Sequence, residues 1–162
     1  MTKSLILIIL AAVVILLVIL FLTGHKSVHD EVVIQASPEK VWEVLTDTDA
    51  YSEWNPAIEI KEGQLTEGEE ILFLFIQGPD NQYDIQAKVK AKQENKLLNQ
   101  VGGTWGVLTF DHKYILEPEG DGTRLIIHEE YKGVGVNFWD PSPLEEVYAG
   151  VNKALKARVE SM

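Results

Sequence analysis

The sequence of 162 residues divides into two segments of opposite character. Lys3 is the only charged side chain in residues 1–24, whereas residues 25–162 carry 13 Lys and Arg against 25 Asp and Glu, a formal net charge of −12. Such an acidic domain repels the phosphates of nucleic acids and of anionic lipids, so we expect no nucleic-acid partner. The chain has no cysteine, which excludes disulfide bonds and thiolate chemistry.

Residues 1–24 have the character of a transmembrane anchor. Every residue from Leu5 to Leu22 is Leu, Ile, Val, Ala or Phe, and the segment has no polar face. As a helix it is about 27 Å long, close to the hydrocarbon thickness of a bilayer. A cleaved signal peptide is the alternative, but the apolar run exceeds the usual ~7–15 residues and no small-x-small cleavage site follows. We therefore predict a single-pass membrane protein.

The charges flanking this segment bear on its orientation. Lys3 favours a cytoplasmic N-terminus, and Lys26 opposes this only slightly because Asp30 and Glu31 follow it. We therefore expect the soluble part to lie outside the cytoplasm. Residues 25–31 are interpreted as a polar linker and the start of a first strand, and residues 32–162 as one domain.

The domain opens with a strand and a short helical region. Residues 32–34 are apolar and β-branched, and Ser37-Pro38 is typical of a helix N-cap followed by proline at the first helical position. A short apolar stripe at helical spacing follows. Residues 47–56 are interpreted as a helix end and a loop that contains Tyr51 and Trp54.

From residue 58 the apolar period changes from helical to two, which predicts a series of antiparallel strands. Gly78-Pro79-Asp80-Asn81 and Gly120-Asp121-Gly122 predict tight turns, and Gly102-Gly103 predicts a bulge or a sharp bend. The six strands expected here cover residues 58–61, 71–76, 83–92, 97–105, 108–116 and 125–131.

A long amphipathic helix is predicted at the C-terminus. Ser142-Pro143-Leu144-Glu145 has the form of a capping box, and apolar residues recur at three- and four-residue steps up to Val159. Consecutive hairpins make a meander, and a strongly bent sheet can wrap one helix with a space left between them. The predicted fold is therefore α+β: a helix-grip fold, in which a curved antiparallel sheet wraps around the C-terminal helix, behind one N-terminal transmembrane helix.

Three stretches of the domain resemble one known superfamily. They are residues 37–56, residues 110–118 with Phe110-Asp111-His112-Lys113-Tyr114, and residues 122–133 with Gly122-Thr123-Arg124-Leu125. Together they resemble the SRPBCC (START-like, polyketide cyclase/dehydrase) superfamily over residues 28–160. The resemblance implies the helix-grip fold and a cavity, but such folds host lipid carriers, hormone receptors, cyclases and folding factors. The anchor departs from the usual soluble member.

One polar pair stands out in the predicted register. A tight hairpin around Gly120-Asp121 places His112 opposite Glu129, with Tyr114 opposite Ile127 on the same apolar face. As a functional pair, Glu129 orients the imidazole and His112 acts as an acid, a base or a hydrogen-bond donor to a ligand. As a structural pair, the two groups satisfy one another and fix the register.

Aromatic residues with a polar tip suit a cavity for an apolar ligand that carries a few polar groups. Ordinary core packing is the alternative for each of them. The candidate ligand-binding residues are Trp54, Tyr83, Trp105, His112, Tyr114, Glu129, Tyr131 and Tyr148. Phe138-Trp139, before the last helix, is interpreted either as a lid or as a contact with the membrane surface.

No metal site or cofactor is expected. His25 and His29 stand four residues apart without a third ligand, and His128 falls on the outer face of its strand. The sequence also has no glycine-rich phosphate loop and no recognisable nucleophile elbow.

Three functions remain open from the sequence. The leading hypothesis is a membrane-tethered domain that binds a hydrophobic small molecule or lipid in the cavity between sheet and helix. The first alternative is an enzyme of the cyclase or dehydratase type that uses His112 and Glu129. The second is a protein-interaction module held at the membrane, which an exposed apolar patch without a cavity would favour.

Overall fold

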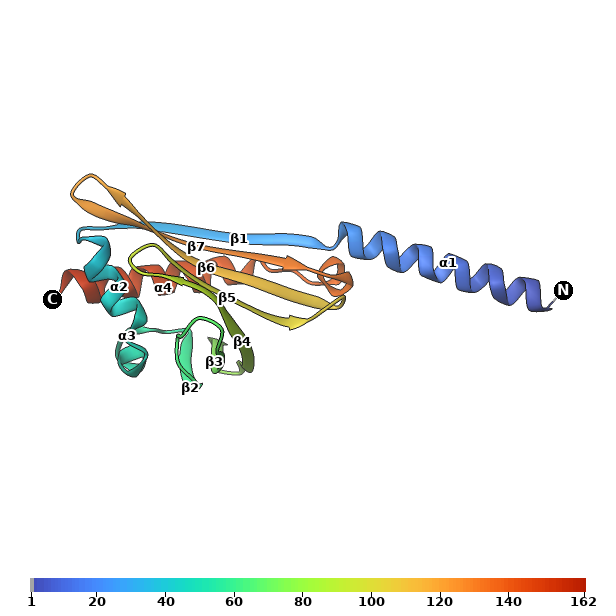
Figure 1. Ribbon diagram of the computed structural model, residues 1–162, viewed down its shortest axis with the longest axis horizontal. Coiled ribbons are helices and arrows are strands. Elements are labelled where there is room, and N and C mark those ends of the chain that lie inside the picture. Colours follow the sequence, from blue (N-terminus) through green and yellow to red (C-terminus); the bar gives the residue numbers. More distant parts are fainter. Residues whose placement is uncertain (1) are drawn as a thin grey trace.

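A computed structural model describes residues 2–162, with one helix projecting from the end of an α+β domain (Figure 1). The elements in chain order are α1 (Thr2–Thr23), β1 (His25–Ile34), α2 (Pro38–Thr46), η1 (Thr48–Ala50), α3 (Tyr51–Trp54), β2 (Ile58–Glu62), β3 (Glu70–Gly78), β4 (Asn81–Gln93), β5 (Leu97–Thr104), β6 (Leu108–Glu119), β7 (Gly122–Lys132), η2 (Val134–Phe138) and α4 (Pro143–Glu160).

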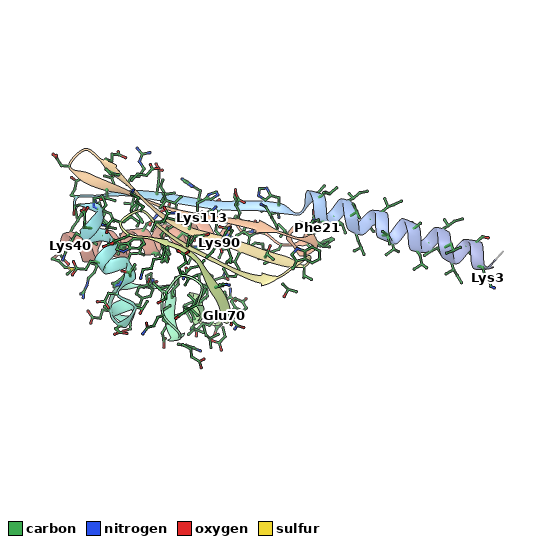
Figure 2. All side chains as sticks on the ribbon, viewed as in Figure 1. Lys3, Phe21, Lys40, Glu70, Lys90 and Lys113 are labelled. Atoms are coloured by element: carbon green, nitrogen blue, oxygen red, sulfur yellow. The ribbon has the colours of Figure 1, made fainter. Side chains whose placement is uncertain are left out.

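The helix α1 projects from the domain and contacts it at its last turn, near η2. Its segment from Lys3 to Thr23 has a mean hydropathy of 3.8, and none of its residues is buried in the structure. Figure 2 shows side chains projecting on all sides, with Lys3 at the far end and Phe21 beside the domain. By length and composition this helix can cross a membrane, a property that a signal sequence shares.

The sheet has seven antiparallel strands in the order β1-β7-β6-β5-β4-β3-β2. The predicted meander is confirmed, and so is the predicted register of its central hairpin: His112 pairs with Glu129 and Tyr114 with Ile127. Because a strand's side chains alternate between faces, this register sends both members of each pair to the inner face.

The first strand is longer than predicted: residues 25–31, interpreted as a linker and the start of the strand, all belong to β1. This strand pairs with β7 from His25 to Ile34. The alternation of apolar residues did not reveal this part of the strand, because Lys26 and Asp30 occupy inward positions where apolar residues are expected. Each finds a polar partner: Lys26 Nζ donates to the carbonyl of Trp139, and Asp30 accepts a 2.6 Å hydrogen bond from Asn152.

The bulge predicted at Gly102-Gly103 lies elsewhere. Both glycines pair without interruption with β6, and the register shift occurs in β4 between Val89 and Ala91. Gly102 is instead required by packing, since a Cβ there would come within 2.6 Å of the Phe110 ring. The glycine therefore gives room for an aromatic ring on the inner face of the sheet.

The C-terminal helix α4 lies along the inner side of the sheet near β1 (Figure 1). Lys156 Nζ donates a 2.7 Å hydrogen bond to the Val33 carbonyl, and Glu160 accepts one of 2.8 Å from the Gln35 amide. The helix is thus fixed at the β1 edge of the sheet. The predicted helix-grip arrangement is confirmed.

The capping box predicted for α4 does not form. Ser142 already has helical backbone angles, φ −54° and ψ −31°, and its side chain makes no capping hydrogen bond. The Asp140 carboxylate accepts a 3.1 Å hydrogen bond from the Ser142 amide instead, and this lowers the pKa of Asp140. The side chain that accepts a backbone amide at the start of α4 is therefore Asp140, two residues before the predicted N-cap Ser142.

Candidate functional site

A cavity of about 420 Å³ lies between the inner face of the sheet and α4. Because α4 is held against β1, the space opens over the other strands, and β1 contributes no lining residue. Its walls are mainly apolar side chains, and the volume falls within the range of small-molecule sites. The lining residues are Ile58, Phe73, Phe75, Gln77, Tyr83, Ile85, Gln100, Leu108, Phe110, His112, Glu129, Tyr131, Trp139, Leu144 and Tyr148.

A second hollow has a different character. It has about 630 Å³ and lies beside α3 and β2, lined by residues such as Asp49, Glu59 and Lys61. An apolar ligand gains little free energy by moving from water into a hollow with polar walls that is open to the solvent. We therefore place the candidate site in the apolar cavity.

Glu129 gathers the polar groups on one wall of the apolar cavity. Its carboxylate is only 5% exposed, and one oxygen, Oε2, accepts hydrogen bonds from the hydroxyls of Tyr131, at 2.6 Å, and Tyr148. His112 Nδ1 lies 3.4 Å from the same oxygen. Three neighbouring side chains thus compensate a carboxylate removed from water, as a buried acid requires.

The hydroxyl groups around this carboxylate are held in their neutral, donating form. Burial, and after it the charge of Glu129, raises the pKa of Tyr131 and of Tyr114 well above the ordinary value. Neutral phenols donate hydrogen bonds, so Tyr131 can keep its bond to Glu129 across the physiological pH range.

His112 presents one unused nitrogen. Its side chain is 8% exposed and its ring lies edge-on to Tyr114 and Tyr148, with centroids 4.7 and 5.4 Å away. Within residues 2–162, the Nε2 atom has no hydrogen-bond partner although it is buried. With Nδ1 beside Glu129, Nε2 is a buried polar atom left without compensation, which is uncommon in a folded domain.

The structure brings five of the eight predicted ligand-binding residues to the cavity. His112, Glu129, Tyr131 and Tyr148 form the polar wall, and Tyr83 lies at the rim, where it is 52% exposed. The pairing of His112 with Glu129 follows from the hairpin register.

Trp54, Trp105 and Tyr114 do not line the cavity. Trp54 is buried against Tyr51, with ring centroids 5.2 Å apart, and Tyr114 is a fully buried core residue behind His112. Trp105 lies in the turn after β5 and is 85% exposed, because the strand ends at Thr104 before the expected alternation reaches it. Trp54 and Tyr114 are therefore core residues and Trp105 is a turn residue, and none of the three belongs to the ligand site.

Sequence reasoning missed Gln100 as a site residue. It lies directly opposite His112 in the β5–β6 pairing and is 7% exposed on the cavity wall. A polar residue at an inward strand position, opposite a candidate histidine, was the available signal. Trp139, predicted as part of a lid or a membrane contact, also lines the cavity and packs against Tyr131.

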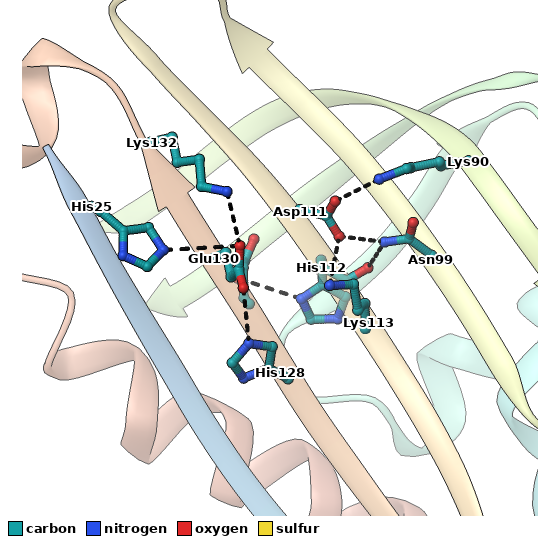
Figure 3. Close-up of polar contacts among 10 residues, drawn as sticks. His25, Lys90, Asn99, Asp111, His112, Lys113, His128, Glu130 and Lys132 are labelled. Atoms are coloured by element: carbon teal, nitrogen blue, oxygen red, sulfur yellow. Dashed lines mark hydrogen bonds and ion pairs between the residues drawn. The ribbon is translucent and has the colours of Figure 1, made fainter. Parts of the chain in front are cut away.

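The outer face of the sheet carries a separate polar network (Figure 3). His25, His128 and Lys132 surround Glu130 at 3.9, 3.7 and 3.2 Å. His128 therefore lies on the outer face, as predicted. Among the residues that the structure describes, no group of three or more His, Asp and Glu has the arrangement of a metal site.

Asp111 holds neighbouring strands together on that outer face. Burial pushes the pKa of Asp111 up, but hydrogen bonds from Lys90 at 2.8 Å and Asn99 at 2.7 Å outweigh it, and the pKa is lowered. Asp111 alternates with His112 along β6, so one residue supports the outer surface while the next faces the cavity.

A curved sheet that encloses an apolar cavity with one long helix defines a helix-grip binding fold. The comparisons with known proteins agree: residues 25–160 match the family model described as polyketide cyclase / dehydrase and lipid transport. The chain belongs to this family, within the SRPBCC superfamily. A comparison with curated protein sequences found no match.

Solved structures share the fold at low sequence identity. The protein CV1439 from Chromobacterium violaceum aligns with a TM-score of 0.69 at 17% identity, over 83% of this chain and 98% of its own. The major latex-like protein 151 from Panax ginseng aligns at 0.66 and 12%, over 83% and 97%. Ara h 8.0201 aligns at 0.66 and 18%, over 85% and 99%. These likenesses establish the fold alone.

Proposed function

We propose that the protein is a membrane-tethered binding domain for a hydrophobic small molecule or lipid held between the sheet and α4. The observation that carries the proposal is a mainly apolar cavity of about 420 Å³ with a cluster of polar groups at His112 and Glu129. Such walls favour a ligand whose apolar body leaves water while one polar group is hydrogen-bonded. The family description includes lipid transport, which is consistent with this ligand class.

The tether gives this binding site a location. The apolar helix α1 has the length and composition of a membrane span, and it continues directly into β1 through Gly24. A ligand dissolved in the bilayer would then be concentrated close to the cavity. Lys3 supports an orientation with the domain outside the cytoplasm.

A photolabelling experiment tests both parts of the proposal. Membranes that contain the full chain are loaded with a diazirine-bearing fatty alcohol and irradiated, and the labelled peptides are mapped. We expect label on α1, which contacts the bilayer, and on the cavity strands and α4. Label on α1 with none in the cavity would contradict the binding site, and the reverse would contradict the tether.

A matched pair of variants locates the label in the cavity. Ile85→Trp places a large ring among the lining residues, whereas Lys88→Trp adds the same ring at an exposed position of the same strand. Cavity labelling should fall strongly in Ile85→Trp and stay unchanged in Lys88→Trp. Equal labelling in both variants would show that the alcohol binds elsewhere.

An enzyme of the cyclase or dehydratase type is the second candidate function. The Nε2 atom of His112 favours it, since this nitrogen is buried without a hydrogen-bond partner in a residue of the cavity wall, and Glu129 lies 3.4 Å from the other ring nitrogen. Such an enzyme would convert its cavity ligand with loss of water, and His112→Phe would stop the conversion while the ligand still binds. Recovery of unchanged ligand from both proteins would instead support a carrier.

A protein-interaction module has less support. That function was expected to accompany an exposed apolar patch on a domain without a cavity, and this domain has a cavity of ligand size.

A further inference from the structure

Exposed apolar side chains gather at one end of the domain. Outside α1, the large hydrophobic residues exposed in the described part of the chain are Tyr83, Trp105, Val107, Phe138 and Met162. Trp105, Val107 and Phe138, here called the collar, are 85%, 57% and 77% exposed. They come from two loops, the β5–β6 turn and η2, that lie beside the end of α1.

The collar is attached firmly to the end of α1. The Phe21 and Trp105 rings are 6.0 Å apart, and Asn137 Nδ2 donates a 2.6 Å hydrogen bond to the Leu20 carbonyl. Thr23 Oγ1 donates to Asn137 Oδ1 at 3.0 Å. The collar therefore lies at the level where α1 ends, which is the level of the membrane interface if α1 spans the bilayer.

The two collar loops also hold one another. The Gly135 amide donates a 2.8 Å hydrogen bond to the Val107 carbonyl, and the Val134 amide donates one of 3.1 Å to Gly106. The Gly133 amide donates at 2.9 Å to Gly24, the residue that follows α1. Three exposed apolar side chains on so constrained a backbone cannot retreat into the core, although exposure to water is unfavourable for each of them.

The collar is continuous with the wall of the cavity. Leu108, which follows Val107, and Trp139, which follows Phe138, both line the cavity. Leu108 and Trp139 are partly buried and pack against the core. At two separate points, therefore, the chain passes directly from the exposed collar into the cavity wall.

We propose that Trp105, Val107 and Phe138 insert into the interfacial region of the bilayer that α1 spans and hold this end of the cavity against the membrane surface. Tryptophan and phenylalanine suit the boundary between headgroups and acyl chains. The occupant is the lipid surface because the collar is continuous with α1. This inference rests on the tether of the proposed function but not on any particular ligand.

Single-cysteine labelling of the full chain tests the collar, since the native sequence has no cysteine. Phe138→Cys and Val107→Cys place an environment-sensitive fluorophore on each collar loop. Asp121→Cys is the control at an exposed turn at the other end of β6, and Ala12→Cys reports on α1 itself. Each variant is studied in phosphatidylcholine nanodiscs with and without lipids that carry a nitroxide near the headgroup, and Ala12→Cys is also studied with lipids that carry the nitroxide near the end of an acyl chain, because residue 12 lies about half-way along α1.

We expect a blue-shifted emission at positions 138 and 107, with loss of most of the fluorescence when nitroxide lipids are present. The label at 121 should show neither change. Quenching at 12 without quenching at 138 and 107 would overturn the collar and leave the tether standing. No quenching at 12 would overturn both. Labels at 138 and 107 shielded from aqueous iodide but not reached by nitroxide lipids would mean that a second copy or another protein covers the collar, which also overturns the proposal.

Discussion

Glu129 is a buried carboxylate beside an apolar cavity, and its neighbours explain how it is tolerated there. A carboxylate without partners in such a place would cost several kcal/mol or become protonated. Tyr131 and Tyr148 donate to one of its oxygens, and His112 Nδ1 lies 3.4 Å from the same atom. The cluster consequently fixes three side chains of the cavity wall in one arrangement.

Removing one of these donors should destabilise the domain measurably. Tyr131→Phe removes a buried hydrogen bond to a charged group, so we expect a loss of about 1.5–3 kcal/mol in the free energy of unfolding. The matched control is Tyr83→Phe, whose hydroxyl bonds to Asn81 at the exposed rim, with an expected change within about 0.5 kcal/mol. Urea unfolding followed by tryptophan fluorescence measures both, and equal effects would contradict the cluster.

The buried tyrosines, two of them beside Glu129, predict how stability depends on alkaline pH. The pKa values of Tyr51, Tyr114 and Tyr131 are raised in the folded state, mainly by burial. These groups therefore contribute stability that is fully present below the ordinary tyrosine pKa of about 10 and is lost progressively as the pH rises above it.

Each such tyrosine should add a slope of about 1.4 kcal/mol per pH unit above that value. Tyr131→Phe should accordingly make the decline between about pH 10 and 11.5 less steep by that amount, because one fewer group titrates only in the unfolded state. The free energy of unfolding of both proteins, measured along this pH series, checks the prediction. An equal slope in Tyr131→Phe and in the wild type would mean that Tyr131 is exposed to water.

At the residue scale, the sequence predicts contacts within a hairpin better than contacts between distant elements. The His112–Glu129 pair follows from one tight turn and the period of a strand. The bond from Tyr148 to Glu129 joins α4 to β7, and no local pattern encodes it. Trp105 was misplaced because a strand boundary one residue earlier turns the side chain from the sheet into a loop.

At the scale of elements, two of the predictions that the structure corrected depend on tertiary contacts. Residues 25–31 form a strand because Lys26 and Asp30 find partners beyond the sheet, which a pattern of apolar residues cannot show. The start of α4 uses Asp140 rather than Ser142, because the chain is already helical at Ser142. The strands and α4 themselves were predictable, since their apolar periods are long and clear.

The fit between β5 and β6 makes a specific prediction for a glycine. Gly102→Ala would bring its Cβ within 2.6 Å of the Phe110 ring and 2.7 Å of the Gln86 carbonyl, so we expect a loss of about 1–3 kcal/mol in stability from overpacking. Because Phe110 lines the cavity, its displacement should also reduce binding of an apolar ligand.

The control for this change is Gly150→Ala in α4, where an added Cβ meets nothing within 4 Å. Alanine in a helix interior should stabilise the protein there by about 0.5–1 kcal/mol. Thermal unfolding of the two variants, measured in parallel, should show a lower stability for Gly102→Ala and a higher stability for Gly150→Ala. A neutral Gly102→Ala would mean that the ring of Phe110 does not lie over β5.

At the scale of the whole molecule, α1 and the cavity domain form one continuous arrangement. The helix passes into β1 through Gly24, where an added Cβ would collide with the Gly133 carbonyl at 2.0 Å. The apolar helix therefore passes into the sheet without a flexible spacer, and with α1 in a membrane, as proposed, the domain would stand directly on the membrane surface.

The orientation of this arrangement is open to a direct check. Asp121→Cys places a unique thiol on the β6–β7 turn, far from α1 along the sheet. With the domain outside the cytoplasm, a membrane-impermeant maleimide should label this thiol in intact cells. Labelling that requires cell lysis would reverse the predicted topology without affecting the cavity.

If the cavity holds an apolar molecule, the purified protein should contain it. Full-length protein, Ile85→Trp and Lys88→Trp are isolated identically, and their bound molecules are extracted and identified by mass spectrometry. Lipids around α1 should be common to all three. We predict an additional apolar species, close to one per chain, in the wild type and Lys88→Trp and its loss in Ile85→Trp. An identical set of extracted molecules from all three proteins would mean that the cavity holds no apolar molecule.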